Sequence, residues 1–120
     1  DSIFITPFQV NQPNFITNKL VSGEITYIKN SVSTIHYDIS RKIICIEGAD
    51  PGFDWIFSRG IGGLITKYGG ANSHMAIRCA EFDLPAAIGC GEQRFEMILK
   101  SKMVTLDCGS GLINSYGKET

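Results

Sequence analysis

Residues 63–88 have the sequence GLITKYGGANSHMAIRCAEFDLPAAI, and this stretch determines most of the architecture. Its two ends, 63–66 and 86–88, are short apolar runs that predict buried strands. Between them, the spacing of apolar residues predicts a helix that runs through Phe82 and stops before Pro85. A strand, a helix and a second strand in this order indicate an α/β fold.

The remainder of the chain continues the alternation of strands and helices. Further strands are predicted over residues 15–21, 23–28, 35–39, 43–46, 103–106 and 112–114. Ser22-Gly23 is interpreted as a turn or a bulge between two of them. Two more helices are expected. One begins with an Asp50 cap and Pro51 and ends at Gly60, and the other covers 92–99.

Length and charge restrict the classes of protein. The chain has 120 residues, 43% of them hydrophobic, and a net charge of -1, which fits one globular domain. The sequence has no basic excess for a nucleic acid or an anionic membrane, and it has no apolar run of membrane-spanning length. We interpret residues 1–12 as an arriving linker or the end of a preceding domain, and 13–120 as the domain itself. Because the sequence begins without Met, we expect a piece of a longer chain.

The cysteines indicate a reducing compartment. Cys45, Cys79, Cys90 and Cys108 form no C-x-x-C pair, and each lies in or beside an apolar run. We expect four buried free thiols and a cytoplasmic protein without a metal site. A zinc site built from these cysteines and His74 is the alternative, although their spacing matches no zinc pattern.

Chemically active residues gather at the start of the predicted helix that runs through Phe82. Asn72 or Ser73 can cap that helix, whose N-terminal amides and dipole favour a phosphate group. Gly69 and Gly70 let the backbone approach such a group closely. His74 stands at the mouth of this site with a nucleophilic imidazole. The combination suits a histidine that accepts and carries a phosphoryl group.

Each of these residues also has a purely structural interpretation. A histidine at a helix start is often a surface or capping residue, and a Gly-Gly pair is often only a turn. Arg59, Lys67 and Arg78 flank the loop, where they can pair with phosphate oxygens or remain solvated charges. We interpret His36 as a surface residue and not a second phosphoryl site. Trp55 is expected in the core or at a domain interface, and Asp107 in a turn.

The same stretch resembles the mobile phosphohistidine domain of phosphoenolpyruvate-utilising enzymes. The resemblance is carried by spaced positions, namely Thr66, Gly69, Gly70, Ser73, His74, Ala76, Ile77, Glu81, Pro85, Ala86 and Gly89. Asp50-Pro51 upstream, and 104–107 with Gly111 downstream, extend it over roughly residues 13–115. Members of this family include phosphoenolpyruvate synthase, pyruvate phosphate dikinase and enzyme I of the sugar phosphotransferase system.

The resemblance implies a fold, a reaction and a set of partners. The fold is the swivelling β/β/α domain, and His74 is the phosphohistidine nucleophile. Thr66, Gly69, Gly70, Asn72 and Ser73 are expected around the phosphate, with Lys67 and Arg78 as supporting residues. The domain is expected to bind no cofactor and to be inactive alone. Mg-ATP is expected on an ATP-grasp domain, and an acceptor such as pyruvate on another domain. The alternatives are phosphorylation from phosphoenolpyruvate, as in enzyme I, and a non-catalytic docking module.

Overall fold

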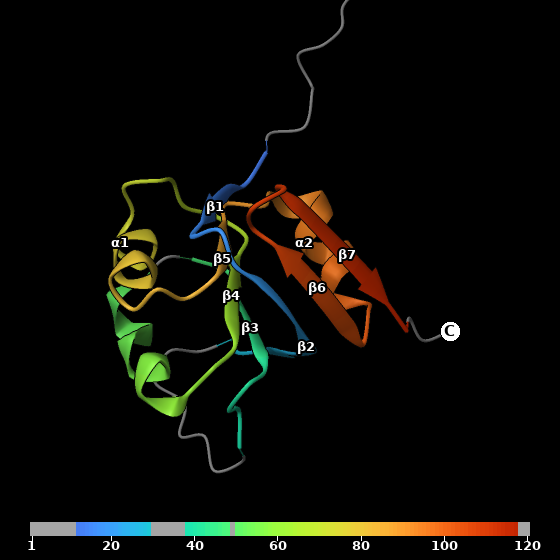
Figure 1. Ribbon diagram of the computed structural model, residues 1–120, viewed down its shortest axis with the longest axis horizontal. Helices are drawn as coiled ribbons and strands as arrows, with labels where there is room; N and C mark the ends of the chain where they lie inside the picture. The colour runs from blue at the N-terminus through green and yellow to red at the C-terminus, as the bar shows by residue number, and fades with distance from the viewer. Residues whose placement is uncertain (1–11, 30–37, 49, 118–120) are drawn as a thin grey trace, which may run out of the picture.

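The computed structural model describes residues 12–29, 38–48 and 50–117 (Figure 1). The elements in chain order are β1 (Asn14–Ile16), β2 (Leu20–Tyr27), β3 (Ile43–Ile46), the 3₁₀ helix η1 (Pro51–Arg59), β4 (Gly63–Thr66), α1 (His74–Glu81), β5 (Ala86–Ile88), α2 (Glu92–Leu99), β6 (Met103–Asp107) and β7 (Leu112–Tyr116). The mixed α/β class is confirmed. The predicted linker, apart from Gln12, and His36 lie outside the described residues, as does most of the predicted strand over 35–39.

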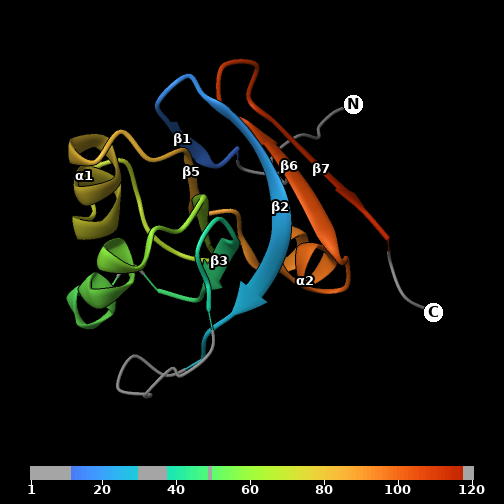
Figure 2. The ribbon, with the colours of Figure 1, turned by 60° about the horizontal axis from the view of Figure 1, so that its bottom comes forward.

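The strands form one curled sheet in the order β1-β5-β4-β3-β2-β6-β7. Strands β2 to β5 pair in parallel, whereas β1 is antiparallel to β5 and the β6–β7 hairpin is antiparallel to β2. Strand β2 therefore belongs to both halves of the sheet, and Figure 2 shows it running across the molecule beside β6.

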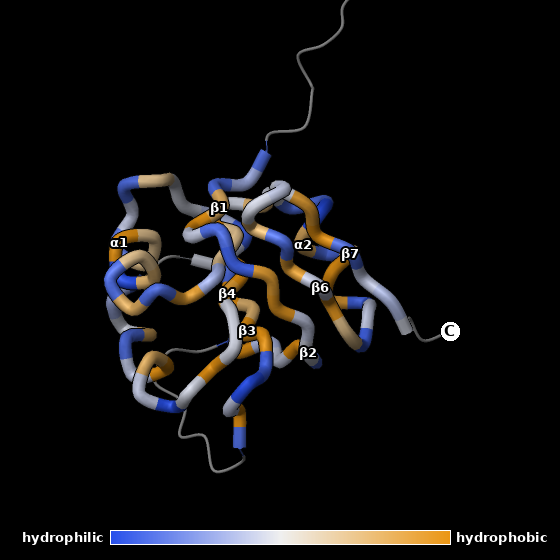
Figure 3. Tube along the Cα trace, in the orientation of Figure 1, coloured by the Kyte–Doolittle hydropathy of each residue, from blue (hydrophilic) through white to orange (hydrophobic). Residues whose placement is uncertain are grey.

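The central strands separate two hydrophobic cores. Every residue of β3 is buried, and its side chains alternate between the cores, with Ile44 and Ile46 on one side and Ile43 and Cys45 on the other. The first core is covered by η1 and α1, and the second by α2 and β6. The hydrophobic colour along β3 in Figure 3 follows from this burial on both faces. The curled sheet thus has η1 and α1 on one side and α2 with β6 on the other, in agreement with the mixed α/β class.

Two details of the predicted strands are wrong, namely the turn or bulge at Ser22-Gly23 and the continuous strand over 15–21, which is divided between β1 and β2. Ser22 and Gly23 form no turn, because β2 continues through both and pairs them with Thr105 and Val104. Glycine at position 23 relieves a tight approach, since a Cβ there would lie 3.0 Å from the Arg41 carbonyl oxygen. The chain reverses instead around Thr17, whose φ of 72° ends β1.

Local capping signals explain both helices on the first core. The Asp50 side chain accepts a hydrogen bond from the Gly52 amide at 2.9 Å, Pro51 begins η1, and Gly60 ends it with a φ of 69°. Ser73 caps α1, which buries Met75, Ala76 and Cys79. The helix predicted over 50–60 is confirmed in position, although it is a 3₁₀ helix.

The four cysteines are all free and buried, as predicted. Cys79 contributes to the first core, and Cys45, Cys90 and Cys108 contribute to the second. Among the described residues, no helix is both long enough and apolar enough to cross a membrane.

Candidate phosphohistidine site

His74 is the first residue of α1, at the end of the loop that leaves β4. The Ser73 hydroxyl donates to the Gly70 carbonyl oxygen at 2.8 Å and accepts from the Ala76 amide at 3.4 Å. The first backbone bond of the helix is donated by Ile77, so the amides of His74 and Met75 precede the intrahelical ladder. The predicted combination of a cap, a helix N-terminus and a histidine is therefore present.

The glycine loop is tied to the ends of β4 and β5. Thr66 is fully buried, and its hydroxyl donates to the Tyr68 carbonyl oxygen at 2.8 Å and accepts from the Gly89 amide at 2.9 Å. Gly89 has a φ of 80°, and a Cβ on it would lie 2.2 Å from the Gly69 carbonyl oxygen. A side chain at position 89 is therefore excluded. Gly69 and Gly70, by contrast, are exposed, so their backbone is accessible to a ligand.

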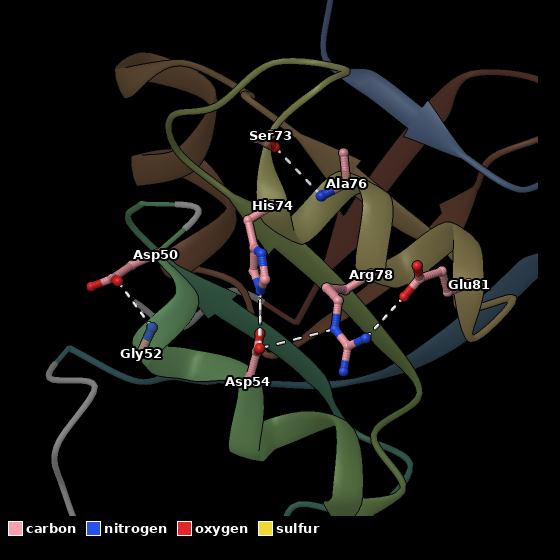
Figure 4. A network of polar contacts seen from close by, with 8 residues as sticks. All are labelled: Asp50, Gly52, Asp54, Ser73, His74, Ala76, Arg78 and Glu81. Carbon is pink, nitrogen blue, oxygen red and sulfur yellow. Dashed lines mark hydrogen bonds and ion pairs between the residues drawn. The ribbon is translucent and has the colours of Figure 1, made fainter.

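The His74 ring is held by a residue from the other helix on this face. Both carboxylate oxygens of Asp54, in η1, approach His74 Nε2, at 2.8 Å and 2.9 Å (Figure 4). The two side chains are about equally accessible, with 37% of His74 and 38% of Asp54 exposed. The imidazole is thus oriented by a carboxylate and remains accessible from solvent.

Arg78 extends this contact along α1. Its Nε lies 3.9 Å from Asp54 Oδ2, and one terminal nitrogen donates to Glu81 at 2.9 Å. The guanidinium also lies over the ring of Phe82, 5.0 Å from its centroid. The Nε atom is buried and has no hydrogen-bond partner among the described residues. Asp54 therefore lies between an imidazole that it contacts and a guanidinium nitrogen that it does not reach.

The other residues predicted near the phosphate have surroundings of their own. Asn72 is exposed in the loop before His74. Lys67 lies on the side of α2, where its ammonium is 3.9 Å from Glu47 and 3.8 Å from Glu96. Burial by itself lowers the pKa of Lys67. Charged neighbours including Tyr68 and Glu47 raise this pKa by more than burial lowers it, so the net shift is upward and the ammonium stays charged. Arg59 stacks on Trp55, with 5.1 Å between the guanidinium carbon and the ring centroid.

The arrangement places a solvent-accessible imidazole beside the backbone amides at the start of α1. In the part of the chain that the structure describes, no three His, Cys, Asp or Glu side chains are grouped to hold a metal ion. The zinc alternative has no ligand set there. An imidazole at a helix N-terminus can form a bond to phosphorus while nearby backbone amides donate hydrogen bonds to the anionic oxygens.

Sequence reasoning did not identify Asp54 as a site residue. It precedes His74 by 20 positions, and no local pattern connects the two residues. The available signal was indirect, because Asp54 lies in the first turn of the helix that the Asp50-Pro51 pair begins. Only the packing of η1 beside α1 on one sheet face brings Asp54 to the ring.

Comparison with known proteins identifies the family. The model of the mobile domain of PEP-utilising enzymes matches residues 39–111, more than half of the chain. The chain belongs to this family. It is 27% identical to a phosphoenolpyruvate synthase of Neisseria meningitidis serogroup B, and 31% identical to a pyruvate kinase of Sporosarcina psychrophila. These alignments cover 80% and 76% of this chain but only 12% and 15% of the relatives.

Solved structures show the same fold. The solution structure of a UPF0107 protein matches with a TM-score of 0.65 at 14% identity, covering 88% of this chain and 97% of that one. A solution structure of Enzyme I matches with a TM-score of 0.52 at 22% identity, covering 63% of this chain and 31% of that one. At these identities the likeness concerns the fold alone, and it agrees with the swivelling-domain architecture.

Proposed function

We propose that this chain is the phosphoryl carrier of a phosphotransferase and that His74 is the residue that carries the group. An imidazole nitrogen forms a bond to the phosphorus of a donor while the bond from phosphorus to the leaving oxygen breaks. An acceptor atom then forms a bond to phosphorus while the bond from phosphorus to the imidazole nitrogen breaks. The observation that carries the proposal is the His74 ring at the capped start of α1, beside an exposed glycine loop.

The chain supplies only part of the reaction. His74 is the nucleophile, and the loop of Gly69, Gly70, Asn72 and Ser73 is the region proposed to face the phosphoryl oxygens. Thr66 and Gly89 act by holding that loop in place. Mg²⁺ and the bound donor are assigned to other domains, so we expect the isolated domain to turn over no ATP.

The proposed donor is ATP on an ATP-grasp domain, which gives its β-phosphoryl group, and the acceptor is a small acid such as pyruvate. Phosphoenolpyruvate is the second donor, and the fold shared with Enzyme I and membership in the family are equally compatible with it. A cytoplasmic enzyme is proposed in both cases. The third candidate is a docking module in which His74 has no chemical role.

The test is phosphorylation of the full-length protein under alkaline conditions, because a phosphorus–nitrogen bond hydrolyses in acid. The protein is incubated with Mg-ATP labelled at the β- or γ-phosphoryl group, or with labelled phosphoenolpyruvate, and examined by intact mass and phosphorus NMR. Wild type is expected to gain one acid-labile phosphoryl group. His74→Gln is expected to gain none, and His36→Gln, the same substitution at the other histidine, is expected to behave as wild type.

The label also separates the candidates. Labelling from the β-position of ATP supports the synthase-like carrier, and labelling only from phosphoenolpyruvate supports the second donor. Overall activity that survives in His74→Gln, without any label in wild type, would leave the docking module as the function.

A further inference from the structure

The contact between Asp54 and His74 has a chemical consequence for the ring. A carboxylate accepts hydrogen bonds and cannot donate them, so its approach to Nε2 at 2.8 Å and 2.9 Å requires a proton on that nitrogen. In the neutral ring the lone pair is then on Nδ1. While Asp54 holds the ring in this way, Nε2 is not nucleophilic.

Nε2 is nevertheless the ring nitrogen that lies farther from the helix backbone. Nδ1 is adjacent to the ring carbon that carries the side chain, close to the backbone of α1, whereas Nε2 points away from it toward η1 (Figure 4). A phosphoryl group on Nε2 would occupy the space that the Asp54 carboxylate fills. It would also place two anionic groups in contact, which is unfavourable in a partly desolvated site. The phosphoryl group and Asp54 therefore compete for one atom.

A second partner for the carboxylate is already present. Arg78 Nε lies 3.9 Å from Asp54 Oδ2 and is buried without a hydrogen-bond partner among the described residues. Glu81 and the ring of Phe82 fix the rest of the guanidinium, so Arg78 stays close when Asp54 moves. A small rotation of the Asp54 side chain would exchange the bond to His74 for a charge-assisted bond to Arg78.

We propose that Asp54 is a positioning residue that holds His74 through Nε2 in the unphosphorylated carrier and transfers its contact to Arg78 when Nε2 takes the phosphoryl group. This inference rests on the proposed function. In the transfer step, the ring first moves its proton from Nε2 to Nδ1 through solvent. The Nε2 lone pair then forms the bond to phosphorus, and the electron pair of the broken bond leaves with the donor oxygen.

The first experiment needs no donor. The full-length protein labelled with ¹⁵N-histidine is examined by NMR in alkaline buffer, and the His74 signals are assigned with His74→Gln. Wild type is expected to carry the proton on Nε2. Asp54→Asn is expected to lose this preference, because an amide can donate to Nε2. Asp83→Asn is the matched control, since Asp83 is exposed, pairs with Lys19 and lies beyond the far end of α1. An unchanged tautomer in Asp54→Asn would overturn the proposed role.

The second experiment uses the phosphorylated protein. Coupling between ³¹P and ¹⁵N is expected at Nε2, together with a shift of the Asp54 carboxylate carbon signal. Arg78→Lys is expected to leave the unphosphorylated tautomer unchanged and to lower the equilibrium ratio of phosphorylated to free protein about three- to fivefold, the effect of one partly exposed ion pair. A phosphoryl group on Nδ1 with an unshifted Asp54 signal would overturn the exchange. If wild type takes no phosphoryl group, the proposed function fails, and so does the proposed change of the Asp54 partner from His74 to Arg78. The tautomer measured in the first experiment then still decides whether Asp54 holds the ring.

Discussion

Gly89 fixes the position of the glycine loop although it lies outside that loop. Its amide donates to Thr66 Oγ1, and the Gly69 carbonyl oxygen occupies the place of the missing Cβ. We expect Gly89→Ala to lower the free energy of unfolding by about 3 kcal/mol, because it combines a positive φ with a backbone clash. Urea denaturation measures the loss, and phosphorylation of His74 is expected to slow as well, since Gly69 must shift.

Gly70→Ala is the control for this prediction. A Cβ at position 70 meets no atom within 4 Å, and the residue is not among those with positive φ. Its unfolding free energy is expected to stay within about 0.5 kcal/mol of wild type. Equal destabilisation by the two substitutions would contradict the assignment of Gly89 as the residue that fixes the loop.

Some residues of the candidate site can be predicted from the sequence, and others cannot. His74 and Ser73 were predictable, because a cap and the residue after it are neighbours in the chain. Asp54 comes into contact with His74 only because two helices pack on the same face of the sheet. Lys67 is adjacent to the loop in sequence, but its ammonium lies among the carboxylates near α2. Residues in a strand alternate between faces, so proximity in sequence does not place them on one side.

The start of α1 serves both stability and the proposed chemistry. The Ser73 hydroxyl is the N-cap, although its 3.4 Å bond to the Ala76 amide is long. Ser73→Ala is expected to cost about 1 kcal/mol of unfolding free energy, measured by urea denaturation. Ser73→Asp is expected to keep the cap on the Ala76 amide but to lose the bond to the Gly70 carbonyl oxygen, and to slow phosphorylation of His74, because it brings a second anion to the phosphate. Slower phosphorylation in Ser73→Ala together with a normal rate in Ser73→Asp would contradict the expectation that an added anion at position 73 slows phosphorylation.

Helices and short strands were predicted well where the signal is local. Asp50, Pro51 and Gly60 define η1 by their own conformational preferences, and four consecutive apolar residues define β3. Gly23 in β2 was misinterpreted as part of a turn, because the close contact at this position is made by a residue distant in sequence. A Cβ at position 23 would lie only 3.0 Å from the carbonyl oxygen of Arg41, which belongs to a different segment. A glycine required for close packing and a glycine required for a turn have the same appearance in a sequence.

For the molecule as a whole, burial of the thiols predicts how stability depends on pH. Burial, with a smaller effect of Cys108, raises the pKa of Cys79 from 9.0 to about 12. Above pH 9 the thiol ionises in the unfolded chain but not in the folded one, so the unfolded state binds fewer protons. The contribution of Cys79 is therefore constant below about pH 9 and falls as the pH rises toward 12.

The measurement compares urea denaturation at about pH 8 and about pH 10 in wild type and Cys79→Ala. Between these pH values, wild type is expected to lose about 1 kcal/mol more unfolding free energy than the variant. This difference isolates the thiol from the tyrosines and lysines that titrate in the same range. Equal losses in the two proteins would show that Cys79 ionises as readily in the folded state as in the unfolded chain.

The burial of every thiol also makes the chain suitable for distance measurements in solution. Met97 is 65% exposed on α2, which packs against the sheet face opposite to η1 and α1. A cysteine introduced there would be the reactive thiol of this chain, and it could carry a fluorophore far from the imidazole. Energy transfer to a second dye elsewhere in the full-length protein would then measure whether the proposed carrier moves, and how fast, while the thiols of the core stay unlabelled.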